Sequence, residues 1–85
     1  MSKHDRVLQA ILEKRANVNW SDVENLLLRC GAEVSEGRGS RVRVALNGVR
    51  AVFHRPHPQK EVDRGALASM RRFLIEAGVA GGELQ

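Results

Sequence analysis

The chain has 85 residues, enough for one domain with a modest hydrophobic core. Its 14 lysines and arginines exceed its 10 acidic residues, and the net charge of +4 favours an anionic partner without requiring one. A single cysteine excludes an internal disulfide, and no apolar run reaches membrane-spanning length, so we expect a reduced, cytoplasmic protein without a membrane partner.

Two helices are predicted in the first third of the chain. Apolar residues at helical spacing predict a helix over residues 4–14, and residues 17–20 interrupt this pattern. Ser21 and Glu24 have the spacing of a capping box, which predicts the start of a second helix. Gly31 suits the left-handed residue that ends this helix. Its core-facing stripe comprises Val23, Leu26, Leu27 and Cys30.

An antiparallel hairpin is the clearest local feature of the sequence. Residues 32–36 are a short strand candidate, and a Gly-Arg-Gly loop follows at 37–39. Asn47 and Gly48 then separate two alternating runs, which is the strongest short-range signal for a two-residue hairpin turn. Counting back from this turn pairs Leu46 with Val49 and Arg41 with His54.

The alternation assigns two faces to the hairpin. The apolar face carries Val42, Val44, Leu46, Val49, Ala51 and Phe53, and the opposite face carries Arg41, Arg43, Arg50 and His54 with Val52 among them. No carboxylate is interleaved among these arginines. Because guanidinium groups match phosphate oxygens in bidentate geometry, this face is a candidate phosphate-binding surface. The alternative is a solvated face that keeps the protein soluble.

The remaining sequence predicts a connection and a third helix. Prolines 56 and 58 prevent residues 55–61 from continuing a central strand, and Asp63 can cap the last helix. The buried stripe of this helix is Ala66, Leu67, Met70, Phe73, Leu74 and Ala77, before Gly78 ends it. We expect an α+β fold in which the second and last helices cover one face of a three-stranded antiparallel sheet, with an extra N-terminal helix.

Two histidines are candidate acid–base groups. His54 lies opposite Arg41 in the predicted register and could act as a general acid or base near neutral pH. His57 lies between two prolines, whose turn cannot be oriented from the sequence. No carboxylate stands at helical spacing to complete a metal site, and there is no phosphate loop or nucleotide fingerprint, so we expect no metal and no cofactor.

Three motifs in order resemble the HicA family of toxins. They are the run Gly39-Ser40-Arg41, the turn Pro56-His57-Pro58-Gln59-Lys60-Glu61, and the last helix with its Ala77-Gly78-Val79 end. The resemblance covers about residues 20–79, so a single HicA-like domain would include an extra helix at 4–14 and a tail at 80–85.

The resemblance implies a double-stranded-RNA-binding-like α-β-β-β-α fold and a bacterial toxin–antitoxin module. In such a module the protein degrades mRNA, and a HicB-like antitoxin holds it inactive. We predict RNA contacts from Arg41, Arg43, Arg50, His57 and Lys60. In the family, the residue after Gly-Ser is the histidine held to be catalytic, and that position is Arg41 here.

Three interpretations remain open. The chain could be a metal-independent mRNA endoribonuclease in which His54 is the catalytic acid–base group and Arg41 stabilises the transition-state charge. It could instead be a non-catalytic RNA-binding or antitoxin-binding domain, because Arg41 replaces the histidine. It could also be a pure interaction protein whose basic face docks an acidic partner.

Overall fold

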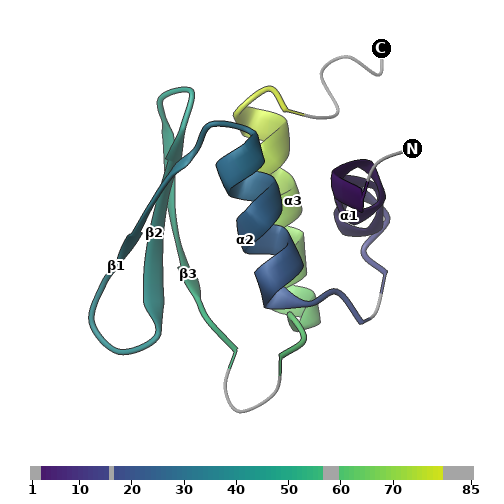
Figure 1. The fold of residues 1–85 in the computed structure, drawn as a ribbon, viewed down its shortest axis with the longest axis horizontal. Coiled ribbons are helices and arrows are strands. Elements are labelled where there is room, and N and C mark those ends of the chain that lie inside the picture. The colour runs from purple at the N-terminus through teal and green to yellow at the C-terminus, as the bar shows by residue number, and fades with distance from the viewer. Residues whose placement is uncertain (1–2, 16, 57–59, 80–85) are drawn as a thin grey trace.

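The computed structural model describes residues 3–15, 17–56 and 60–79, which contain three helices and a three-stranded antiparallel sheet. The elements are α1 (Lys3–Leu12), α2 (Trp20–Arg29), β1 (Glu33–Glu36), β2 (Arg41–Leu46), β3 (Val49–His54) and α3 (Arg64–Glu76). Helices α2 and α3 cover one face of the sheet, and α1 lies on the far side of both from the sheet (Figure 1). This arrangement confirms the predicted α+β fold, which is double-stranded-RNA-binding-like with an N-terminal helix.

The hairpin has the predicted register. Leu46 pairs with Val49, and the pairing continues without a bulge to Arg41 and His54. Asn47 and Gly48 have φ angles of 52° and 83°, the left-handed values that a type I′ turn requires at both central positions. The sheet order is β1-β2-β3, so β2 is the central strand and β1 and β3 are its edges.

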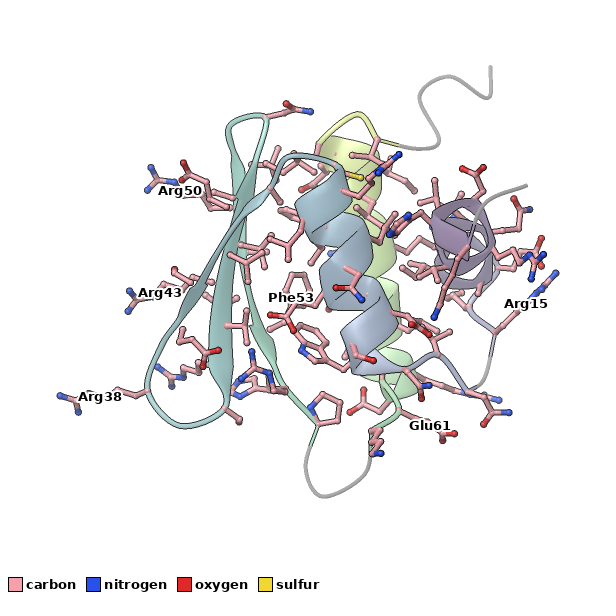
Figure 2. All side chains as sticks on the ribbon, viewed as in Figure 1. Arg15, Arg38, Arg43, Arg50, Phe53 and Glu61 are labelled. Carbon is pink, nitrogen blue, oxygen red and sulfur yellow. The ribbon has the colours of Figure 1, made fainter. Side chains whose placement is uncertain are left out.

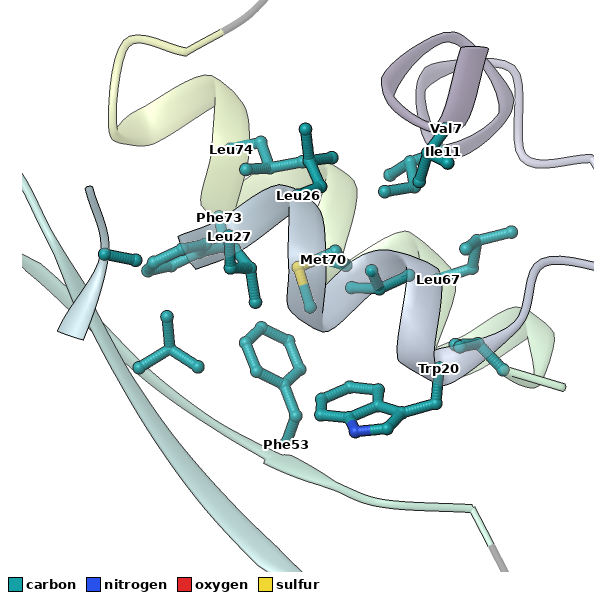
Figure 3. Close-up of a cluster of buried hydrophobic side chains, with 14 of the residues drawn as sticks. Val7, Ile11, Trp20, Leu26, Leu27, Phe53, Leu67, Met70, Phe73 and Leu74 are labelled. Atoms are coloured by element: carbon teal, nitrogen blue, oxygen red, sulfur yellow. The ribbon is translucent and has the colours of Figure 1, made fainter. Parts of the chain in front are cut away.

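The core lies between the sheet and the helix pair α2–α3. Phe53 of β3 meets Phe73 of α3 edge to face, with ring centroids 5.8 Å apart (Figure 3). The predicted stripes are buried, except that Cys30 and Ala66 are only partly covered. The fully buried side chains with the largest volumes are Ile11, Leu27, Leu67, Met70 and Leu74. The apolar face of the hairpin therefore forms one wall of this core.

The predicted capping box at the start of α2 is wrong. The helix begins two residues earlier, at Trp20, and its N-cap is Asn19 rather than Ser21, with no side-chain cap hydrogen bond. A backbone bridge determines this start, because the Trp20 amide donates to the Lys60 carbonyl at 2.9 Å and Asn19 pairs with Glu61. Trp20 is buried, so core packing and the bridge outweigh the local preference of Ser21 for the cap position.

The other predicted helix ends are mostly confirmed. Asp63 caps α3, since its Oδ1 accepts from the Ala66 amide at 2.7 Å. Gly31 and Gly78 both have positive φ after α2 and α3. Helix α1 is shorter than predicted: it ends at Leu12, and Lys14 has a φ of 53°, which an α-helix cannot continue through.

Helix α1 is attached to the helical layer rather than to the sheet. Val7 and Ile11 are buried in the common core. The Arg71 side chain of α3 donates to the Leu12 carbonyl at 3.0 Å, and Lys3 pairs with Asp22 of α2 at 3.1 Å. Within the described residues, no helix is long and apolar enough to cross a membrane.

Candidate nucleic-acid interface

The side of the sheet that faces away from the helices is the candidate site, and we call it the outer sheet face. The strand registers place its side chains in three rows across the strands. The rows are Glu33–Ala45–Arg50, Ser35–Arg43–Val52 and Arg41–His54. The structure therefore brings together the four hairpin residues that the sequence assigned to a polar face.

The arginines of this face are available to a ligand. Arg41, Arg43 and Arg50 are exposed, and none of them forms an ion pair within the described part of the chain. Arg43 and Arg50 point away from the helices, and Arg38 of the loop between β1 and β2 also points outward (Figure 2). Arg38 was missed by the sequence reasoning because loop positions have no alternation to assign them to a face.

The first strand adds an acidic residue to the face. The hairpin alone suggested a surface without carboxylates, but the pairing of Glu33 with Ala45 places Glu33 in the same row as Arg50. Glu33 is exposed and forms no ion pair among the described residues. Positive charge is therefore concentrated on β2 and β3, and the β1 margin is acidic.

A tight loop holds Arg41 in place opposite His54. The Gly37 amide donates to the Arg41 carbonyl at 2.8 Å, and the Arg41 amide donates to the Arg38 carbonyl at 3.1 Å. A Cβ atom at Gly37 would lie 3.2 Å from the Arg41 Cβ, closer than an ordinary van der Waals contact, so the close approach of these strands favours glycine there. The Arg55 amide donates to the Ser40 carbonyl at 2.8 Å, which extends the ladder beyond the Arg41–His54 row.

The charge of Arg55 is paired with carboxylates of the protein itself. Its guanidinium holds Glu36 with two hydrogen bonds of 3.2 and 2.9 Å and reaches Glu24 of α2 at 3.5 Å. The hydrogen bond from Arg55 and its charge lower the pKa of Glu36 below the ordinary value of 4.5. Arg55 therefore ties the ends of β1 and β3 to α2 and contributes little free charge to the surface.

Two hollows adjoin His54 and Arg43. A shallow hollow of about 310 Å³ on the outer sheet face is lined by Glu33, Ser35, Arg43, Val44, Ala45, Arg50, Ala51 and Val52. A second hollow of about 270 Å³, which we call the edge groove, lies between β3 and the start of α3. The edge groove is lined by Val52, Phe53, His54, Asp63, Gly65, Ala66 and Ser69. Val52 lines both hollows, and 55% of its surface is exposed.

Of the other two predicted RNA contacts, the structure describes only Lys60, which does not belong to the outer sheet face. Lys60 is exposed, but its backbone joins the bridge to the start of α2 rather than any strand of the sheet. His57 lies outside the described residues. In residues 3–15, 17–56 and 60–79, no three His, Cys, Asp or Glu side chains are grouped so that they could hold a metal ion.

Comparison with protein-family models matches residues 20–79 to the HicA toxin of bacterial toxin–antitoxin systems. The chain belongs to the HicA toxin family. No curated protein and no solved structure matches the chain. The matched range of this HicA-family chain includes α2, the sheet and α3, whereas α1 lies before it. The outer sheet face and the edge groove both belong to the family portion.

Proposed function

We propose that the protein is the toxin of a toxin–antitoxin pair, a metal-independent endoribonuclease that cleaves mRNA and is neutralised by a HicB-like antitoxin. The observation that carries this proposal is the direct cross-strand pairing of Arg41 with His54 on an exposed basic face. Family membership supports a toxin role and an RNA target. The pairing supports this assignment because a histidine side chain that can transfer protons and an arginine that can stabilise negative charge lie on neighbouring strands of one face.

The proposed reaction uses a nucleophile that RNA carries itself. His54 accepts the proton of a ribose 2′-hydroxyl, and the 2′-oxygen forms a bond to the adjacent phosphorus. The bond between phosphorus and the 5′-oxygen breaks, and the proton returns from His54 to that oxygen. The products are a 2′,3′-cyclic phosphate and a 5′-hydroxyl. Arg41 pairs with the non-bridging oxygens, where negative charge increases in the transition state.

A second function is favoured by one specific observation. Arg41 occupies the position at which the family resemblance places the catalytic histidine, and an arginine remains protonated throughout the physiological range. Within the described residues, His54 is the only histidine on the outer sheet face. If His54 does not transfer protons, the same face would serve as a non-catalytic RNA-binding or antitoxin-binding surface.

The test is induced expression of the wild type and of His54→Ala, Arg41→Ala, His57→Ala and Arg72→Ala. Growth arrest and mRNA loss are scored at matched soluble protein levels. Arg72 is an exposed arginine of α3 and controls for the loss of one positive charge. We expect His54→Ala to lose at least about 100-fold in cleavage rate, in line with the contribution of a general acid–base group. We expect Arg72→Ala to retain the toxicity of the wild type.

The outcomes separate the two candidates. Full toxicity of His54→Ala would contradict the assignment of His54, and loss of toxicity in His57→Ala alone would transfer the acid–base role to His57. A wild type that retains RNA in binding assays but cleaves none would support the non-catalytic function instead.

A further inference from the structure

The edge of the sheet at β3 carries a row of unused backbone groups. Antiparallel pairs alternate between residues that exchange two hydrogen bonds and residues that exchange none. The bond from the Arg55 amide to the Ser40 carbonyl fixes this alternation, so Phe53, Ala51 and Val49 bond to β2. The amide and carbonyl groups of Arg50, Val52 and His54 therefore point outward from the free edge.

These three residues also present their side chains on the outer sheet face. Arg50, Val52 and His54 are all exposed, and no hydrogen bond within the described residues uses their outward backbone groups. A polypeptide strand paired with this edge would therefore lie against His54 and extend the sheet by one strand.

Strand β3 has few of the features that protect a sheet edge. Natural proteins protect free edges with bulges, prolines, charged side chains or very short strands. Strand β3 has six residues, its register with β2 is regular, it contains no proline, and Arg50 is its one arginine or lysine. The edge groove runs beside it, lined by Asp63 and Ser69 of the neighbouring α3 region, and can receive alternate side chains of an added strand.

Charge distinguishes this edge from the opposite one. Strand β1 is four residues long and carries Glu33 on the outer sheet face, so an acidic partner is repelled there, whereas the charge of Glu36 is paired with Arg55. At β3 the partner meets Arg50 on the outer sheet face, with Arg43 one strand away. The one carboxylate in the edge groove, Asp63, lies on the helix side and caps α3. An acidic, extended segment therefore complements the β3 edge and no other edge of the described sheet.

We propose that the free edge of β3 docks an extended acidic segment of the antitoxin, which adds a strand to the sheet and covers His54. The inference rests on the proposed function for the identity of the partner and for the role of His54. Backbone hydrogen bonds supply affinity in such strand addition, and the arginines select acidic side chains. The same contacts would exclude RNA from the Arg41–His54 row, so binding and neutralisation are one event.

The test uses isotope-labelled full-length protein and a capped synthetic peptide of about eight alternating glutamates and valines. A matched peptide carries lysine in place of glutamate. Backbone amide exchange and chemical shifts are followed by NMR. We expect the acidic peptide to slow exchange at Arg50, Val52 and His54, and the lysine peptide to bind at least about tenfold more weakly.

Two variants of one residue isolate the backbone contribution. Val52→Pro removes an outward amide without removing any bond to β2, and Val52→Thr retains that amide with a β-branched side chain of similar shape. We expect peptide affinity to fall about tenfold in Val52→Pro and to change less than about twofold in Val52→Thr. The circular dichroism spectrum and melting temperature of each variant report whether the sheet is intact.

The outcomes do not depend on whether the protein cleaves RNA. Protection at residues other than Arg50, Val52 and His54, or equal binding by both Val52 variants, would overturn the docking site. If Val52→Pro does not fold, the amide-exchange pattern of the wild type is the deciding result.

Cleavage of RNA by the same preparations is measured in parallel. Protected edge amides without cleavage would contradict the proposed activity and leave the docking proposal standing. Protection of these amides by single-stranded RNA but not by the peptide would assign the edge to RNA.

Discussion

His54, the last residue of β3, and Arg55, which follows it, show how adjacent residues serve different purposes. The side chain of His54 is exposed on the outer sheet face without a partner among the described residues, whereas Arg55 is held by Glu36 and Glu24. The strand alternation sends the two side chains to opposite faces of the sheet. Arg55 is therefore a positioning residue: it anchors the ends of two strands beside the Arg41–His54 row.

The ion pair with Arg55 makes stability depend on pH in a defined direction. The pKa of Glu36 is lowered in the folded state, so its contribution is complete above the unfolded value of 4.5 and disappears as pH falls through the lower, folded value. We expect Glu36→Gln to melt below the wild type near pH 7 and to match it near pH 2–3. Thermal melts across this range measure the difference in melting temperature between the variant and the wild type. A difference that persists in acid would show that the carboxylate charge is not its cause.

Contacts of this kind could not be predicted from the sequence. The pair Arg55–Glu36 spans 19 positions, and the Asn47 side chain donates to the Ala77 carbonyl, 30 positions away, at 2.7 Å. Rules for turns and helices concern residues up to about four positions apart. They therefore identified Asn47 as a turn residue but could not predict its hydrogen bond to Ala77. Glu33 joined the outer sheet face for the same reason, because only the pairing of β1 with β2 assigns it there.

At the scale of elements, the predictions from sequence agree best with the structure where the signal comes from neighbouring residues. They agree worst where contacts between distant segments determine the bounds of an element. The hairpin register follows from two turn residues and an alternating pattern, and the structure reproduces it in full. The Asp63 cap is similarly local. The prediction of where α2 begins failed because a backbone bridge from residues 60–61, about 40 positions away, holds Trp20 and Asn19.

Helix α2 offers a comparison between adjacent leucines that tests its buried face. Leu27 has no exposed surface, whereas Leu28 is 54% exposed. We expect Leu27→Ala to lower the free energy of unfolding by about 2–5 kcal/mol, through lost transfer energy and the cavity left behind. We expect Leu28→Ala to change it by less than about 0.5 kcal/mol. Urea denaturation measures both values, and similar losses in the two variants would mean that the helix packs on a different face.

At the scale of the whole molecule, charge and apolar surface are separated by layers. The sheet places its apolar side against α2 and α3, and α1 covers these helices from the other side (Figure 1). The outer sheet face is left uncovered by any described helix, and its free arginines lie on the central strand and on β3. All three aromatic residues of the chain, Trp20, Phe53 and Phe73, are buried in the core, so the RNA binding that we propose for this face depends on charge rather than on aromatic stacking.

Recognition through phosphate charge has a measurable signature in salt. The logarithm of the affinity for single-stranded RNA falls with the logarithm of salt concentration by about 0.7 per phosphate contact. We expect Arg43→Ala to reduce this slope by about 0.7 and to weaken binding to unrelated RNA sequences equally. Arg72→Ala removes the same charge from the exposed surface of α3 and should leave the slope almost unchanged. Fluorescence anisotropy at several salt concentrations gives the slopes. Equal slopes for the two variants would show that RNA responds only to net charge and that the outer sheet face is not where phosphates bind.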